Sequence, residues 1–234
     1  MQSWIASVGE QVAEVRRRLV AAEQAAGRPP GSVRLLAATK TLTVPQALAA
    51  VEVGLDLVGE SRVQELVVKG PAWAQCPTPP TVHFIGVLQS NKIARTIPLV
   101  DCVQSVATTR LAAGLSRRAK TPLDVMVQVN TSGETTKSGV APVDAVEFAL
   151  QVAELPNLRL AGFMTIGPNT DDEAVIAAAY NRLRQIRDDV VASGAPGTQE
   201  ATELSMGMTN DLEIAVAAGA TMVRVGTALF GARD

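Results

Sequence analysis

The sequence contains few of the side chains that carry catalysis or metal binding in many protein classes. Aromatic residues make up only 3% of the 234 positions, and His83 is the single histidine, so no histidine cluster is available for a metal. The two cysteines, Cys76 and Cys102, lack the spacing of a metal or redox site, and we expect free thiols in a reducing, cytoplasmic compartment. A Gly-rich phosphate loop and a Ser/His/Asp arrangement are also missing.

Long apolar runs and an excess of charge of one sign are missing as well. No apolar stretch is long enough to span a bilayer, and the sequence does not begin with the basic and then apolar pattern of a secretory signal. With 21 basic and 23 acidic residues the net charge is -2, so we expect neither nucleic acid nor a membrane surface as a partner. The basic runs 16–18 and 117–118 fall in expected helices and are interpreted as solvated faces.

What the chain has instead is a repeated alternation of apolar runs and amphipathic segments. Apolar residues at helical spacing predict a helix over residues 3–26. Eight short apolar runs follow, at residues 33–38, 55–58, 82–85, 102–106, 125–129, 158–164, 202–204 and 222–225. Hydrophobic residues make up 47% of the chain, which suits parallel strands that are buried on both faces. The pattern predicts a (β/α)8 TIM barrel, an α/β fold, as one domain over residues 1–234, with residues 1–30 as an extra helix and loop.

The main structural alternative is an open, doubly wound sheet. That fold usually has a Gly-rich first turn, whereas residues 38–41 read Ala-Thr-Lys-Thr. Local signals agree with the barrel: Thr43 and Gln46 form a capping box, and Gly54 and Gly219 fall where helices should end.

Lys40 closes the first apolar run, at the end of the barrel where such folds carry their sites. A lysine in a partly desolvated site has a lowered pKa, so that more of it is the neutral amine that attacks an aldehyde. From position alone, a solvated lysine at a strand tip is an equal alternative.

The ends of the seventh and eighth runs have the features of a phosphate site. Ser205 offers a hydroxyl, and Gly207 and Gly226 allow close approach of the backbone. Thr227 begins a final turn, residues 228–232, whose free N–H groups favour negative charge. The alternative is that these glycines serve only tight turns.

Arg224 lies inside the last apolar run. Strand alternation places it on the same face as Met222 and Gly226. A buried arginine needs an acceptor, and the alternative to a ligand is a structural ion pair with Glu203 or Asp124.

Seven motifs, in order along nearly the whole chain, resemble the pyridoxal phosphate homeostasis protein family. They lie at residues 38–41, 58–66, 83–92, 128–134, 162–168, 204–208 and 222–231. The resemblance implies a barrel like the N-terminal domain of alanine racemase, without the second domain of that enzyme. It also implies pyridoxal 5′-phosphate (PLP) as the cofactor.

The resemblance assigns roles to individual residues. Lys40 corresponds to the lysine that forms the Schiff base with PLP, and Arg224 to the arginine that faces the pyridine nitrogen. The residues implied to bind the cofactor are Lys40, Ser61, Ser205, Met206, Gly207, Arg224, Gly226 and Thr227. No residue is assigned a catalytic role, and no metal site is implied.

Three positions depart from the family pattern. Ser61 stands where the family has an asparagine near the cofactor, and Val87 where a histidine is common. Thr209 replaces a frequent serine and is expected to cap the helix that begins there.

The implied function is storage, buffering or delivery of PLP rather than catalysis. An arginine has no acceptor, so it keeps the pyridine nitrogen unprotonated, and the ring is then a weak electron sink. An alanine-racemase-like enzyme needs a second acid or base, yet the single tyrosine, Tyr180, lies on an expected outer helix over residues 171–191. A Schiff-base aldolase is the other alternative.

The expected partners are PLP and the apo forms of PLP enzymes that would receive it, and the chain is expected to be a monomer. Lys137 lies in a polar loop after the fifth run. It is interpreted as a solvated loop residue, with transient PLP binding during exchange as the alternative.

Overall fold

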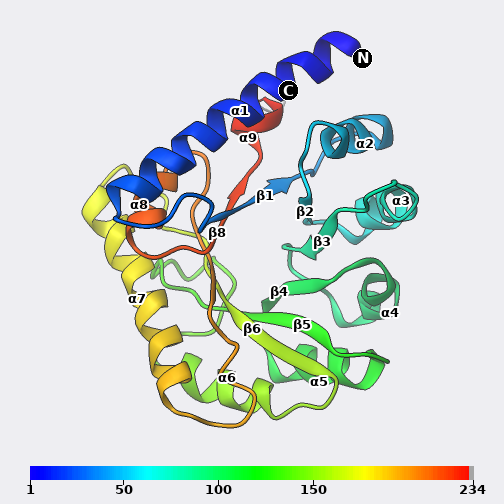
Figure 1. The fold of residues 1–234 in the computed structure, drawn as a ribbon. Coiled ribbons are helices and arrows are strands. Elements are labelled where there is room, and N and C mark those ends of the chain that lie inside the picture. The colour runs from blue at the N-terminus through cyan, green and yellow to red at the C-terminus, as the bar shows by residue number, and fades with distance from the viewer. Residues whose placement is uncertain (232–234) are drawn as a thin grey trace.

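The computed structural model, which describes residues 1–231, contains a closed barrel in which eight parallel strands follow one another in sequence order (Figure 1). The strands are β1 (Arg34–Ala38), β2 (Leu57–Glu60), β3 (Thr81–Phe84), β4 (Cys102–Val106), β5 (Leu123–Gln128), β6 (Leu158–Met164), β7 (Glu203–Ser205) and β8 (Met222–Val225). Each lies at one of the predicted apolar runs. The barrel prediction is therefore confirmed.

Helices connect the strands and cover the outside of the barrel (Figure 1). They are α1 (Gln2–Ala25), α2 (Val44–Glu52), α3 (Val63–Trp73), η1 (Ser90–Lys92), α4 (Ile93–Thr96), η2 (Ile97–Leu99), α5 (Thr109–Arg118), α6 (Ala145–Ala153), α7 (Glu173–Ala192), α8 (Leu212–Ala217) and α9 (Thr227–Phe230). None of the helices within residues 1–231 combines the length and apolar character needed to cross a membrane.

The local signals for helix ends are confirmed. Thr43 caps α2 in a capping box with Gln46. Gly54 and Gly219 follow α2 and α8 with φ angles of 89° and 102°, a conformation that favours glycine.

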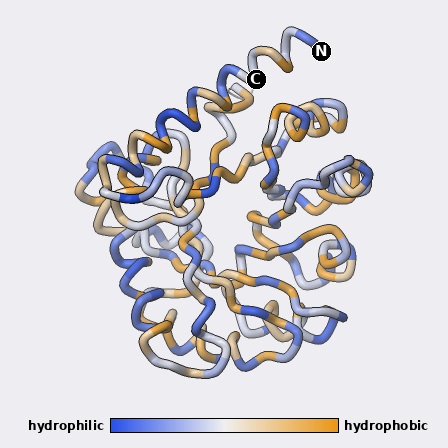
Figure 2. Tube along the Cα trace, viewed as in Figure 1, coloured by the Kyte–Doolittle hydropathy of each residue, from blue (hydrophilic) through white to orange (hydrophobic). Residues whose placement is uncertain are grey.

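Two hydrophobic layers result from the alternation of side chains along the strands. A small cluster fills the barrel interior and consists of Leu36, Leu57, Cys102, Met126, Met164 and Met222. A larger core lies between the strands and the helices. In Figure 2 hydrophobic residues run along the strands, whereas α7 alternates between hydrophilic and hydrophobic positions. Flexible methionines fill the narrow interior in place of the scarce aromatic residues.

The helix α1 packs along α8 and α9, next to the last two strands (Figure 1). Arg18 Nε donates to Glu213 at 2.9 Å, and Arg18 Nη2 donates to the carbonyl of Thr209 at 2.9 Å. Arg16 Nη2 donates to the carbonyl of Gly54 at 2.6 Å. Arg16 and Arg17 are exposed, as a solvated face predicts, whereas Arg18 is half-buried, and both Arg16 and Arg18 also bond to other elements.

Candidate functional site

The strands β1, β7 and β8 bring the predicted site residues to one end of the barrel. In the register of the sheet, Ala37 pairs with Val225, so the residues that follow β1 and β8 meet. A Cβ placed on Gly226 would lie 3.4 Å from the Cβ of Ala38. Lys40, two residues beyond Ala38, is exposed and lies in the turn that leads to α2.

A buried lysine, Lys69, forms hydrogen bonds to the first half of this turn. The Lys69 side chain is 3% exposed, and its Nζ donates to the carbonyl of Thr39 at 2.7 Å and to Glu60 Oε1 at 2.7 Å. The Thr39 hydroxyl donates to the same carboxylate oxygen at 2.8 Å. Burial raises the pKa of Glu60, and the bond from Lys69 opposes that shift. The residue before Lys40 is thus fixed through both its carbonyl and its side chain.

Glu65 holds the second half of the turn. Its Oε2 accepts from Lys69 Nζ at 2.9 Å and from the backbone N–H of Thr41 at 2.8 Å. Burial alone would raise the pKa of Glu65, but these bonds to its carboxylate lower the pKa overall. Thr41 has a φ angle of 76°, which is unusual for a β-branched residue. The residues on both sides of Lys40 are therefore tied to one buried group of charges.

Sequence reasoning did not find this group of charges. Glu65 and Lys69 are four residues apart on α3, the spacing at which opposite charges on a helix pair. Glu60 stands at the end of β2, outside that helical pattern. The spacing of the helical pair was a visible signal, whereas its connection to the turn required the tertiary structure.

Arg224 is buried, 7% exposed, and its partners are neutral. Nη1 donates to the Ser205 carbonyl at 2.6 Å and to the Ser205 hydroxyl at 2.8 Å, and Nη2 donates to the Thr165 carbonyl at 2.7 Å. Burial lowers the pKa of Arg224 from its ordinary value. Within residues 1–231 no carboxylate forms an ion pair with the guanidinium, and the charge of Asp211 acts on it only from beyond ion-pair distance.

The ion-pair alternative for Arg224 is wrong within the described residues. Glu203 instead pairs with Arg34 at 3.0 Å, and Asp124 pairs with Arg159. Both of these pairs are partly exposed, whereas Arg224 faces the barrel interior.

Ser205 connects Arg224 to a polar chain through the barrel. Its hydroxyl donates to Gln104 Oε1 at 2.6 Å, and Gln104 Nε2 lies 2.6 Å from His83 Nδ1. Burial and the charge of Arg34 lower the pKa of His83 to about 4, so the ring is neutral at pH 7. Because the Ser205 hydroxyl already uses its proton, its visible contribution is to orient Arg224.

The loop from β7 to α8 follows Ser205 and is fixed at Gly207. Met206, the residue between them, is fully buried. Gly207 has a φ angle of 91°, and its carbonyl accepts from the N–H of Arg224 at 2.9 Å. An added Cβ would lie 2.4 Å from the Cβ of Ala215. The backbone conformation and the packing at position 207 therefore both require a glycine, whether or not a ligand is bound.

Asp211 closes this loop and brings Tyr180 to the site. Its Oδ1 accepts from the N–H of Met208 at 2.6 Å, and its Oδ2 accepts from the Tyr180 hydroxyl at 2.6 Å. Tyr180 is fully buried, and burial raises its pKa. Tyr180 lies on an outer helix, as predicted, and its buried side chain reaches the β7–α8 loop. Its place in the apolar stripe of α7, between Ile176 and Leu183, was the signal.

The last turn, α9, meets the β7–α8 loop through Thr209. The Thr209 hydroxyl accepts from the N–H of Ala228 at 3.4 Å. It does not cap α8, because that helix begins at Leu212 with Asp211 as its N-cap residue. The capping prediction for Thr209 is therefore wrong. The predicted turn over residues 228–232 ends at residue 232, which lies outside the described residues.

Gly226 differs from Gly207. Its φ angle is -125°, and an added Cβ would make only ordinary contacts, at 3.4 Å, with Ala38. The fold therefore does not itself require a glycine at this position. Thr227, at the start of α9, is exposed.

The remaining predicted positions lie in neighbouring loops. Ser61 is half-buried, and Gly86 packs so closely on its backbone that an added Cβ would overlap its carbonyl. Val87 is 68% exposed. Lys137 is 21% exposed, with Nζ 2.6 Å from Glu134 Oε1 and 2.7 Å from the carbonyl of Gly167. Its interpretation as a solvated residue is wrong.

The sequence matches known families over nearly its whole length. A family model described as the N-terminal domain of alanine racemase matches residues 11–234. A Pseudomonas aeruginosa protein named pyridoxal phosphate homeostasis protein is 42% identical, with 98% of this chain and 97% of that protein covered. An Escherichia coli protein of the same name is 38% identical, with 97% of each chain covered.

Solved structures resemble the barrel closely. PipY of Synechococcus elongatus with PLP bound is 31% identical, covers 96% of this chain and 100% of its own, and has a TM-score of 0.82. Alanine racemase from Corynebacterium glutamicum is 14% identical, with a TM-score of 0.74 over 98% of this chain and 62% of the enzyme. The second likeness shows the fold alone.

Proposed function

This chain belongs to the pyridoxal phosphate homeostasis protein family, and we propose that it binds PLP at the ends of β1, β7 and β8 to store, buffer or deliver it. The observation that carries this proposal is Arg224. It is a buried cation whose partners within residues 1–231 are a hydroxyl and two carbonyls. Such a group suits a neutral ring nitrogen as a further acceptor.

The remaining residues suit the aldehyde and the phosphate of the cofactor, as Arg224 suits its ring nitrogen. Lys40 is proposed to hold the aldehyde as a Schiff base, because its turn is rigidly supported by Lys69 and Glu65. The phosphate is proposed to lie at the turn formed by Gly226 and Thr227, because a residue without a side chain lets the backbone come close to an anion. Ser205, Met206 and Gly207 are proposed to support this site from the β7 side. Ser61 is proposed to contact the cofactor as well.

Binding rather than catalysis is the assigned role. The curated relatives are named homeostasis proteins rather than enzymes. The cofactor supplies an electron sink when its ring nitrogen is protonated, and Arg224 donates hydrogen bonds and cannot supply that proton. Racemisation needs an acid or base on each face of the substrate, and the Tyr180 hydroxyl is already donated to Asp211.

We further propose that the protein is a cytoplasmic monomer that passes PLP to apo-enzymes. The free thiols of Cys76 and Cys102 fit a reducing compartment. The exposed large apolar side chains are spread over several helices and loops, with Val67 and Val68 of α3 as neighbours in sequence, which suits a chain without a permanent partner. In the alternative in which Lys137 carries PLP during exchange, Lys137 must first leave Glu134.

Borohydride reduction after incubation with PLP tests the covalent site. Peptide mass mapping should find a pyridoxyl phosphate adduct on the peptide that contains Lys40, and the adduct should disappear in Lys40→Ala. An adduct confined to other lysines would overturn the assignment. The aldolase-like alternative would then be tested with phosphorylated sugars.

A matched pair of glycine variants tests the phosphate site. Gly226→Ala should change the free energy of unfolding by less than about 0.5 kcal/mol but weaken PLP binding about tenfold. Gly207→Ala should cost about 1–3 kcal/mol of stability, because its φ angle is positive. Unchanged PLP affinity in Gly226→Ala, measured by fluorescence titration, would place the phosphate elsewhere.

A further inference from the structure

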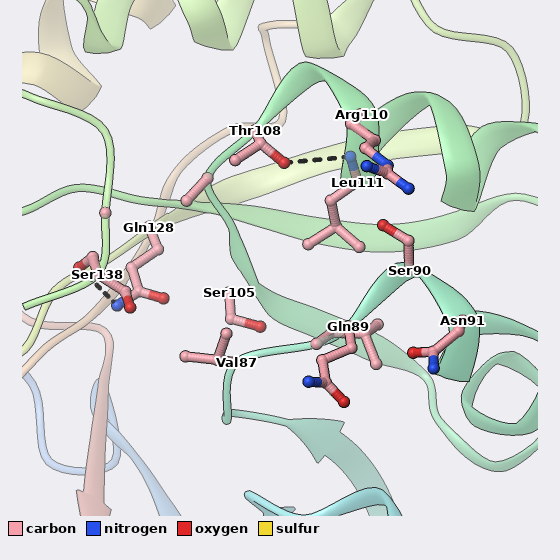
Figure 3. Close-up of a pocket in the computed structure, with 13 residues that line it drawn as sticks. Val87, Gln89, Ser90, Asn91, Ser105, Thr108, Arg110, Leu111, Gln128 and Ser138 are labelled. Carbon is pink, nitrogen blue, oxygen red and sulfur yellow. Dashed lines mark hydrogen bonds between the residues drawn. The ribbon is translucent and has the colours of Figure 1, made fainter.

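A second cleft opens at the ends of β3, β4 and β5, across the barrel from the strands that carry Lys40 and Arg224. Its volume is about 600 Å³. Figure 3 shows the residues that line it. Its polar lining includes Gln89, Ser90, Asn91, Ser105, Thr108 and Arg110. None of these residues belongs to the site described above, so the cleft needs its own explanation.

Ser105 is the feature that points to a ligand. It is only 4% exposed, and its hydroxyl has no hydrogen-bond partner within residues 1–231. It lies where the register of β4 against β5 shifts between Val103 and Val106. Figure 3 shows its hydroxyl pointing into the space bounded by Gln89 and Leu111. Buried polar groups in proteins are nearly always satisfied, so this one is set up to bond a molecule in the cleft.

The charge of the cleft selects an anion. Among the described residues that line it, Arg110 is the one charged residue. It is exposed and forms no ion pair within residues 1–231. It lies in the first turn of α5, a ten-residue helix without acidic residues in that turn. The positive end of the helix dipole and the guanidinium both favour a negatively charged ligand.

Apolar side chains complete the lining. Leu88 and Leu111 are buried, 5% and 6% exposed, and both border the cleft. We propose that this cleft binds a small organic anion, with its carboxylate or phosphate on Arg110 and Ser105 and its apolar body against Leu88 and Leu111. A zwitterionic amino acid fits less well, because the lining has no carboxylate for its ammonium group. The inference does not depend on PLP binding at Lys40.

Calorimetric titrations with benzoate and with inorganic phosphate test this site, with benzamide as the neutral control. They are done on the untreated protein and on protein reduced with borohydride after loading with PLP. Arg110→Gln should weaken anion binding about tenfold, whereas Arg117→Gln, an exposed change at the far end of α5, should leave it unaltered. Ser105→Ala should weaken binding about threefold without lowering the melting temperature, because no protein hydrogen bond is lost.

The outcomes separate the possible sources of the anion. Benzoate binding favours carboxylates, and binding of phosphate alone favours phosphate esters; both support the site if Arg110→Gln weakens them. Equal binding of benzamide and benzoate, no binding of either anion, or equal effects of the two arginine variants would overturn it. Phosphate binding that is lost after PLP reduction and insensitive to Arg110→Gln would belong to the β7–β8 side and would also overturn it.

Discussion

Two buried cations flank the proposed cofactor site, and the protein treats them differently. Lys69, 3% exposed, is surrounded by the carboxylates of Glu60 and Glu65. Arg224, 7% exposed, is held by a hydroxyl and carbonyls. A cation in direct ion pairs supports structure, whereas a cation whose direct partners are neutral remains able to act on a ligand. At one end of the barrel, Lys69 therefore has a supporting role and Arg224 a proposed role in binding.

Removing the cation from the group formed by Lys69, Glu60 and Glu65 should have the largest effect on the free energy of unfolding. Lys69→Met leaves buried Glu60 without its cation, and we expect a loss of about 3–5 kcal/mol in urea unfolding. Adding Glu60→Gln should restore part of the loss, because the buried negative charge is gone. Lys137→Met is the matched control, since its ion pair with Glu134 is more exposed and should matter much less. An equal loss in Lys69→Met and the control would contradict the supporting role.

Acid should lower the stability of the folded protein through His83, the last side chain in the hydrogen-bonded series that runs from Ser205 through Gln104. The pKa of His83 is about 4 in the folded protein and about 6.5 in the unfolded chain, so the unfolded state binds more protons between these values. Stability should therefore fall as the pH drops from about 6.5 to 4, by about 3 kcal/mol in total. His83→Gln should remove this part of the pH dependence. An unaltered slope in the variant would show that other groups cause it.

Removing the charge of Arg224 should weaken both folding and cofactor binding. Arg224→Gln loses hydrogen bonds to Ser205 and Thr165, and we expect a stability loss of about 1–3 kcal/mol. PLP binding should weaken about tenfold, and the absorbance of the bound cofactor should change. Arg34→Gln, at the other end of the barrel, should alter neither property of the cofactor. Normal PLP affinity in Arg224→Gln would remove the distinction between the two cations.

The barrel could be predicted because its signal is local. Alternating apolar runs and helix-ending glycines, such as Gly54, depend on residues that are near in sequence. The face on which Arg224 lies also followed from alternation along one strand. The position of Ala38, two residues before Lys40, beside Gly226 required only the parallel register of a barrel.

Contacts between distant polar side chains could not be predicted in the same way. Nothing in the local sequence distinguishes Lys69 from the other four lysines. Its partners are Thr39, directly after β1, and Glu60, at the end of β2. Thr209 has the local chemistry of a helix cap, yet it accepts from Ala228 because tertiary packing brings α9 to it. A polar group takes the partner that the fold places nearby, and the sequence alone does not rank the candidates.

The contacts of α1 bear on when the site is completed during synthesis. Arg18 and its partner Glu213 are 195 residues apart, and Trp4 stacks on Phe230 with ring centroids 6.3 Å apart. The first helix therefore leaves the ribosome long before the segments that it holds. Contacts of such separation form late, because a long stretch of chain must be ordered first. We expect the β7–β8 side of the site to be the last part of the barrel to close, so nascent chains that still lack it would not retain PLP.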